Sequence, residues 1–164
     1  MLNMDTLLTE KEEIKNLSCN KKLVLFVCTG NTCRSPMCSA LFNDKFGREY
    51  HSDSAGLFTD GSPITENAKA ALFDFGVKPT AENNFADYIS KPVTEELMKK
   101  AETVVGVSSS HAMQLIMLFP LYASKITSLP HDIKDPFGGS VEKYKECLLD
   151  ISMALGEMFP GGET

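Results

Sequence analysis

The sequence predicts an α/β fold of three layers, α/β/α, built around a central parallel sheet of four strands. Apolar segments of strand length alternate along the chain with segments of helical periodicity, and the links between them are short. This alternation is typical of a parallel sheet covered by helices. The first strand segment, residues 23–27, is an unbroken apolar run, LVLFV. Such a run indicates a strand that is buried on both faces.

The helix that follows this strand has clear boundary signals. Ser35 and Pro36 suit an N-cap and a first helical position, and Gly47 predicts the end of the helix after Phe46. Three further strands are expected, just before Ser54, at residues 103–107 and, as a weaker signal, at residues 125–129. Four further helices are expected, from Pro63 to Gly76, from a cap at Thr94, from Ser110 through Phe119, and from Val141 to about Met158.

Size and composition indicate one domain. The chain has 164 residues, of which 43% are hydrophobic and 23% charged, and this is ordinary for a soluble globular protein. Residues 1–20 are polar with apolar residues at loosely helical intervals, so we expect an N-terminal arm or short helix before a domain that spans residues 21–164. The net charge of -6 argues against binding to nucleic acid or to an anionic membrane. We expect a monomer.

The sequence also points to a cytoplasmic location. No apolar run approaches the ~20 residues that span a bilayer, and acidic residues early in residues 1–20 argue against a signal peptide. The five cysteines are an odd number and lack the spacing of a disulfide framework, which fits a reducing compartment. At least one of them is therefore a candidate reactive thiol.

The segment CTGNTCRS, residues 28–35, has the composition of a phosphate-binding loop. It lies between a predicted strand and a predicted helix, where an open parallel sheet places its ligand crevice. Gly30 permits close approach of the backbone to an anion, and the helix N-terminus behind the loop favours negative charge. Arg34 can hold a phosphate through two parallel hydrogen bonds. The chain has only two arginines, so its position six residues after Cys28 is informative.

The same surroundings favour the thiolate form of Cys28, because a helix N-terminus and a guanidinium both stabilise negative charge. The candidate nucleophile Cys28 and the anion-binding Arg34 (the clamp) therefore support each other's roles. The loop predicts a cysteine-dependent phosphatase. The alternative interpretation is a buried structural cysteine beside a turn.

Residues 27–37, VCTGNTCRSPM, resemble the active-site loop of the low-molecular-weight protein tyrosine phosphatase superfamily. The segments SAG (54–56), PVTEEL (92–97) and DPFGG (135–139) resemble other landmarks of that superfamily, in the same order. The resemblance covers the chain from Lys22 to the last helix. It implies the Rossmann-like fold of these phosphatases, a cysteinyl-phosphate intermediate, phosphorylated proteins as substrates, and no metal or other cofactor.

The resemblance also assigns roles to single residues. Asp135 is implied as the acid that protonates the leaving group and then as the base that activates water; taken alone, its Asp-Pro dipeptide is an ordinary turn signal. Ser35 is implied to stabilise the thiolate, and Ser54 to support Asn31 in bracing the loop. The expected catalytic residues are Cys28, Arg34 and Asp135. The expected substrate-binding residues are Thr29, Gly30, Asn31, Thr32, Cys33, Ser35 and Phe137.

Thr32 favours phosphoarginine over phosphotyrosine as the substrate. Tyrosine-directed members usually carry an apolar branched residue at this position, whereas the protein-arginine-phosphatase branch resembles this chain in carrying threonine. A hydroxyl narrows and polarises the mouth of the pocket, which suits a guanidinium better than a phenyl ring. The segment that begins with the implied acid Asp135 (residues 135–139, the acid loop) also carries one aromatic residue, Phe137, where tyrosine-directed members often have two.

Other cysteines and the histidines have weaker assignments. Cys33 is close enough in sequence to Cys28 for reversible oxidation to a disulfide, as in related enzymes. Cys19, Cys38 and Cys147 are interpreted as structural. His51, His111 and His131 lack metal-ligand spacing and are interpreted as ordinary. Tyr88 stands where much of the family has a histidine that supports the loop asparagine.

Four other functions share part of this pattern. A tyrosine phosphatase has the same chemistry on another substrate. A thioredoxin-coupled arsenate reductase needs further cysteines in the middle of the chain, and none lies between Cys38 and Cys147. A phosphocarrier domain needs neither Arg34 nor Asp135. A pseudo-enzyme is disfavoured because nucleophile, clamp and acid are all present.

Overall fold

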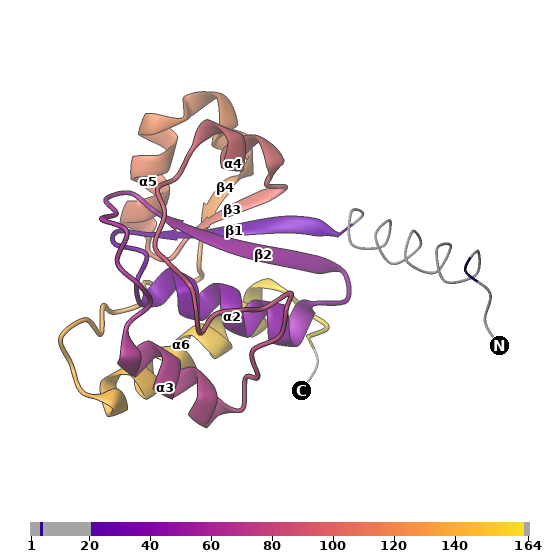
Figure 1. The fold of residues 1–164 in the computed structure, drawn as a ribbon. Helices are drawn as coiled ribbons and strands as arrows, with labels where there is room; N and C mark the ends of the chain where they lie inside the picture. The colour runs from indigo at the N-terminus through magenta and orange to yellow at the C-terminus, as the bar shows by residue number, and fades with distance from the viewer. Residues whose placement is uncertain (1–3, 5–20, 163–164) are drawn as a thin grey trace.

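The computed structural model describes residue 4 and residues 21–162. Its core is a sheet of four parallel strands in the order β2-β1-β3-β4. The strands are β1 (Lys22–Cys28), β2 (Tyr50–Gly56), β3 (Thr103–Gly106) and β4 (Ile126–Ser128). The expected four-stranded parallel sheet is confirmed (Figure 1).

Helices cover both faces of this sheet. The helices α2 (Arg34–Phe46), α3 (Glu66–Phe75) and α6 (Val141–Met158) lie on one face, whereas α4 (Glu95–Lys100) and α5 (Ser109–Leu118) lie on the other (Figure 1). Strand β1 alternates between the two sides: Phe26 packs into the apolar core under α2 and α6, and Leu25 and Val27 pack into a second core toward α4 and α5. The expected three-layer α/β/α architecture is therefore confirmed.

The register of the strands brings two loops to the end of β1. Cys28 pairs with Gly56 of β2, and Val27 pairs with Gly106 of β3. Because all strands run in the same direction, the segments that follow these residues meet at the carboxyl edge of the sheet. That edge is where the predicted phosphate-binding loop begins.

Most predicted boundaries are close to those observed. The helix α6 spans Val141–Met158 as expected, α2 ends before Gly47, and α3 ends at Gly76, whose φ of 94° is left-handed. The strands expected at residues 103–107 and 125–129 are each slightly shorter, as β3 and β4. The short 3₁₀ helix Pro120–Lys125 was not expected.

Three helix starts differ from the prediction. The helix α2 begins at Arg34 with Cys33 as its N-cap, so Ser35 is inside the helix and does not cap it. The Ser35 hydroxyl is engaged by Cys28 and Asn31 instead. The helix α3 begins at Glu66, and α5 begins at Ser109 after its cap Ser108. Several Ser and Thr residues compete as caps in these loops, and tertiary contacts select among them.

The prediction of an arm or short helix at residues 1–20 lies outside the described residues, apart from residue 4. Within the described residues, no helix combines the length and the apolar character needed to cross a bilayer.

Candidate active site

The loop from Cys28 to Ser35 curls between β1 and the first turn of α2. Backbone hydrogen bonds tie its outer edge to neighbouring segments: the Thr29 oxygen accepts from the Phe58 N–H at 2.9 Å, and the Thr32 oxygen accepts from the Thr65 N–H at 3.0 Å. The tight curl is taken by Asn31, which has a left-handed φ of 59° and is the one non-glycine residue with positive φ in the described chain. Asparagine tolerates this conformation better than most residues.

The sulfur of Cys28 receives hydrogen bonds from within the loop. It lies 2.9 Å from Ser35 Oγ and 3.3 Å from the backbone N of Asn31. Ser35 Oγ itself accepts from Asn31 Nδ2 at 2.8 Å, so the Ser35 hydroxyl hydrogen can be donated either to the sulfur or, over a longer distance of 3.5 Å, to the Ala55 backbone oxygen. A thiolate sulfur can accept hydrogen bonds from both the Ser35 hydroxyl and the Asn31 N–H.

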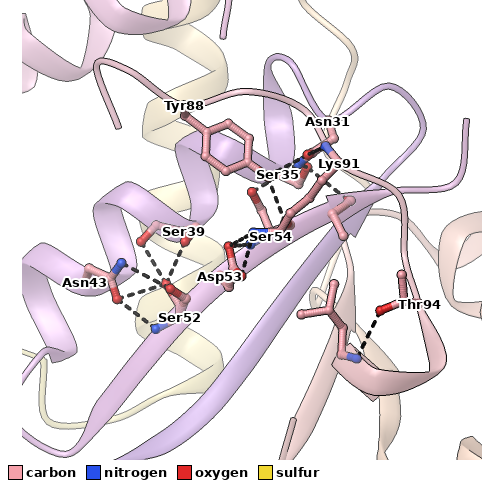
Figure 2. A network of polar contacts seen from close by, with 12 residues as sticks. Asn31, Ser35, Ser39, Asn43, Ser52, Asp53, Ser54, Tyr88, Lys91 and Thr94 are labelled. Atoms are coloured by element: carbon pink, nitrogen blue, oxygen red, sulfur yellow. Dashed lines mark hydrogen bonds and ion pairs between the residues drawn. The ribbon is translucent and has the colours of Figure 1, made fainter. Parts of the chain in front are cut away.

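Asn31 is at the centre of the network that holds the loop (Figure 2). Its side chain is fully buried and forms four hydrogen bonds. Nδ2 donates to Ser35 Oγ and, at 3.0 Å, to Ser54 Oγ. Oδ1 accepts from the Tyr88 hydroxyl at 2.6 Å and from the Lys91 N–H at 3.0 Å. The amide therefore has both of its donors and both acceptor positions occupied, and its orientation is determined.

Tyr88 supports Asn31 from outside the loop. Its hydroxyl also lies 2.8 Å from the backbone oxygen of Ser54. Burial is the main cause that raises the pKa of Tyr88 to about 12, so the phenol stays protonated over the physiological range. Lys91, whose N–H also donates to Asn31, forms an ion pair with Asp53 at 2.6 Å.

Arg34 and Asp135 form an ion pair at the site. Arg34 Nη2 is 3.6 Å from Asp135 Oδ2, and Arg34 Nη1 donates to the Ile133 backbone oxygen at 3.2 Å. The Arg34 side chain is 11% exposed, whereas the Asp135 side chain is 55% exposed. The Asp135 carboxylate also accepts from the Phe137 N–H at 3.1 Å, which holds the acid loop in a turn. The candidate nucleophile, clamp and acid thus line one cavity.

This cavity has a volume of about 350 Å³, and all the loop residues from Cys28 to Arg34 line it, together with Phe137. Five further residues line it from the segment between β2 and α3, and no sequence motif indicated them: Phe58, Asp60, Ser62, Pro63 and Thr65. Phe58 and Phe137 are both largely exposed. The acid loop has one aromatic residue, as expected, but Phe58 brings a second to the mouth. The number of aromatic residues therefore does not separate the two candidate substrates.

Cys33 is turned toward the core. Its sulfur lies 3.3 Å from the Tyr144 hydroxyl and 3.7 Å from Thr65 Oγ1. Burial is the main cause that raises the pKa of Tyr144 to about 12. Cys28, Cys33, Cys38 and Cys147 are all free thiols. Cys19 lies outside the described residues. Cys38 and Cys147 are buried, and burial raises the pKa of each thiol.

His111 lies beside the loop, although its sequence context indicated nothing of the kind. It is 3% exposed, and its Nε2 is 3.0 Å from Thr29 Oγ1. Burial first, and the Arg34 charge second, lower the pKa of His111 to about 4. The only available signal was its position three residues after the Ser108 cap, at the carboxyl end of a predicted strand. His51 and His131 are exposed. No group of three metal-ligating side chains occurs in the described part of the chain.

Comparison with known proteins places this site in a family. Residues 23–161 match the family described as low molecular weight phosphotyrosine protein phosphatase. The protein-arginine-phosphatase of Bacillus subtilis is 38% identical over 146 residues, which cover 82% of this chain and 93% of that protein. The same comparison finds an arsenate reductase of Brevibacillus brevis at 26% identity.

Solved structures agree with the sequence match. The YwlE arginine phosphatase of Geobacillus stearothermophilus superposes with a TM-score of 0.75 at 32% identity, over 84% of this chain and 90% of that one. A low molecular weight protein tyrosine phosphatase from T. tengcongensis superposes with a TM-score of 0.76 at 33% identity, over 84% and 97%. Because the family match spans the sheet, the loop and the acid segment, the chain belongs to the low molecular weight phosphotyrosine protein phosphatase family.

Proposed function

We propose that this protein hydrolyses phosphoarginine on proteins through a cysteinyl-phosphate intermediate. The observation that carries the proposal is Thr32, which lines the mouth of the cavity that also holds Cys28 and Asp135. The relatives named protein-arginine-phosphatase in two bacilli, at 38% and 35% identity, support the same substrate.

In the first step, the Cys28 thiolate attacks phosphorus in line with the departing nitrogen. Arg34 and the inward-facing N–H groups of the loop stabilise the charge on the non-bridging oxygens. Asp135 donates a proton to the guanidine nitrogen as the P–N bond breaks. The Ser35 hydroxyl, 2.9 Å from the sulfur, stabilises the thiolate before attack and as it departs.

In the second step, water hydrolyses the cysteinyl-phosphate. Asp135, now a carboxylate, takes a proton from the water, which attacks phosphorus while the Cys28 thiolate leaves. The position of Asp135 on an exposed turn beside Arg34 suits both roles, because the carboxyl can face the leaving group and then the water. The residues present supply every proton transfer, so the cycle requires no cofactor.

Thr32 acts on selectivity by shape and polarity. A branched apolar side chain at this position packs against a phenyl ring, whereas the Thr32 hydroxyl presents a hydrogen-bonding surface to a planar guanidinium. Its backbone is fixed by the bond from Thr65, so the side chain has a defined place at the mouth. Asp135 adds an acceptor for guanidinium N–H groups. Tyrosine phosphatase activity is the second candidate, since related structures carry that name.

The test is a comparison of kcat/KM on matched peptides that carry phosphoarginine or phosphotyrosine. We expect a preference for phosphoarginine of at least about tenfold, because a buried polar mismatch costs on the order of 1–3 kcal/mol. Thr32→Ile should shift the ratio toward phosphotyrosine, whereas the control Thr127→Ile, on an exposed position of β4, should not. Cys28→Ser should abolish both activities. A wild-type preference for phosphotyrosine would refute the assignment of phosphoarginine.

We also propose that peroxide oxidises Cys28 reversibly in a cytoplasmic enzyme. Peroxide converts the thiolate to a sulfenic acid, and Cys33 then attacks it to form a disulfide with release of water. Cys33 must first leave its contact with the Tyr144 hydroxyl. Activity lost to peroxide should return with dithiothreitol in the native protein but not in Cys33→Ser. Equal recovery in both proteins would contradict this role.

A further inference from the structure

We propose that His111 is a positioning residue for the phosphate-binding loop, which holds the Thr29 hydroxyl so that its hydrogen points toward a phosphoryl group bound there. The proposal rests on the phosphatase function given above, but it does not depend on whether the substrate is phosphoarginine or phosphotyrosine. His111 would act through Thr29 and would not itself contact the substrate.

The orientation of the His111 ring follows from its place at the start of α5. Its Nδ1 accepts a hydrogen bond from the Ser108 N–H at 3.1 Å, while the Ser108 side chain accepts from the His111 backbone in the reciprocal capping box. A nitrogen that accepts a hydrogen bond carries no proton, so in the neutral ring the proton lies on Nε2. Nε2 therefore donates to Thr29 Oγ1, at 3.0 Å.

This bond leaves the Thr29 hydroxyl with one function. Its oxygen accepts from His111, so its own hydrogen remains to be donated, and His111 is its one hydrogen-bond partner in the described part of the chain. The Thr29 backbone is fixed as well, because its oxygen accepts from Phe58. Thr29 lines the cavity next to Cys28. An anion bound in the loop is the natural acceptor for this hydrogen.

The charges around His111 support a neutral donor. The ring is buried, and the Arg34 guanidinium disfavours a second positive charge nearby, although Asp132 and Asp135 oppose that effect in part. A neutral imidazole orients Thr29 without adding a cation that would compete with Arg34 for the phosphate or pair with the Cys28 thiolate. A lysine could not do this at the same place.

Two substitutions test the roles of the two nitrogens of the His111 ring separately. His111→Asn retains an acceptor close to the position of Nδ1 and so preserves the cap of α5, but it loses the donor to Thr29. His111→Gln can place an amide N–H close to the position of Nε2 and so retains that donor. Thermal unfolding of both variants reports on the cap, and kinetics report on the contact with Thr29.

The kinetic probe is p-nitrophenyl phosphate, a phosphomonoester that requires neither proposed specificity, with inorganic phosphate as inhibitor. We expect His111→Asn to lower kcat/KM and to weaken inhibition by phosphate about tenfold each, since a hydrogen bond to a charged group is lost. His111→Gln should restore both to within about threefold of wild type. Losses of the same size in both variants would overturn the proposal, because a merely structural ring does not distinguish them.

A double-mutant cycle tests whether His111 acts through Thr29. Thr29→Val removes the hydroxyl with little change in shape, and we expect about a tenfold loss from it alone. In the Thr29→Val background, His111→Asn should cause no further loss, because the pair acts as one unit. Additive losses would also overturn the proposal. A protein without activity on p-nitrophenyl phosphate and on both the phosphoarginine and the phosphotyrosine peptides would instead refute the proposed function itself.

Discussion

The hydroxyl of Tyr88 lies 2.6 Å from Oδ1 of Asn31, 57 positions away in the sequence. Asn31 is the buried residue with left-handed φ on which the curl of the phosphate-binding loop depends. A phenol therefore braces the loop from outside, through one hydrogen shared between Asn31 and the Ser54 backbone oxygen. The shape of the loop is a property of this network and not of the loop alone.

Removal of the Tyr88 hydroxyl should lower activity and stability without unfolding the protein. We expect Tyr88→Phe to lower kcat about tenfold and the free energy of unfolding by about 1–2 kcal/mol, because Asn31 Oδ1 loses a buried donor. Steady-state kinetics and urea unfolding measure the two effects. Tyr88→His should recover part of the activity but add an inflection to the pH profile between pH 5 and 8. Native Tyr88, with a pKa near 12, should contribute none there. Full activity in Tyr88→Phe would contradict this role.

Gly56 should be intolerant of any side chain. A Cβ there would lie 2.6 Å from Thr59 Cγ2, 2.7 Å from the Thr29 oxygen and 2.9 Å from Asn31 Cβ. We expect Gly56→Ala to destabilise the fold by about 2–3 kcal/mol and to lower activity, since two of the three crowded atoms, those of Thr29 and Asn31, belong to the loop. Gly156→Ala is the matched control, because no atom lies within 4 Å of its Cβ and it sits in α6. The control should gain roughly 0.5–1 kcal/mol. Differential scanning calorimetry compares them, and equal stability would refute the steric argument.

Asp135→Asn should reduce kcat by a factor that depends on the leaving group of the substrate. We expect a loss of about 10²- to 10⁴-fold on phosphoarginine peptides, where the departing nitrogen needs a proton. The loss should be smaller on p-nitrophenyl phosphate, whose leaving group departs readily as an anion. Asp150→Asn, at an exposed position of α6, is the control and should match wild type. An equal loss on both substrates would argue against proton donation by Asp135.

His111 should make the folded state sensitive to acid. The ring has a usual pKa near 6.5 when the chain is unfolded and about 4 in the folded protein. Between these values the unfolded state binds a proton that the folded state does not, so stability falls as pH falls. Above pH 6.5 the ring is neutral in both states and contributes no slope. We expect a loss of about 2 kcal/mol between pH 6.5 and pH 4, after allowance for screening by solvent.

Urea unfolding of the wild type and His111→Gln over this range measures the effect. As pH falls, the free energy of unfolding should decrease more for the wild type than for His111→Gln. His51→Gln is the control, because His51 is exposed. A pH-independent difference between wild type and His111→Gln would show that the ring titrates normally in the folded protein.

Local patterns in the sequence were enough to predict the layered α/β fold, the candidate nucleophile Cys28 and the anion-binding Arg34, whereas Asp135 was assigned as the acid only by family resemblance. The apolar run in β1, the glycine at the end of α3, the cap of α4 and the spacing from Cys28 to Arg34 act over a few residues, so they can be interpreted without the rest of the chain. The start of α2 is an instructive error. Ser35 has the ideal local pattern of an N-cap, but the buried sulfur of Cys28 and the amide of Asn31 engage its hydroxyl.

Contacts between distant segments decided the rest. Phe58 reaches the cavity because β2 pairs with β1 and ends beside the loop, and His111 reaches Thr29 because β3 flanks β1 on the other side. Neither residue belongs to a motif. The order of strands in a sheet is a non-local property set by burial and pairing, so sequence alone determined the chemistry of the loop, whereas tertiary structure decided which side chains surround and orient it.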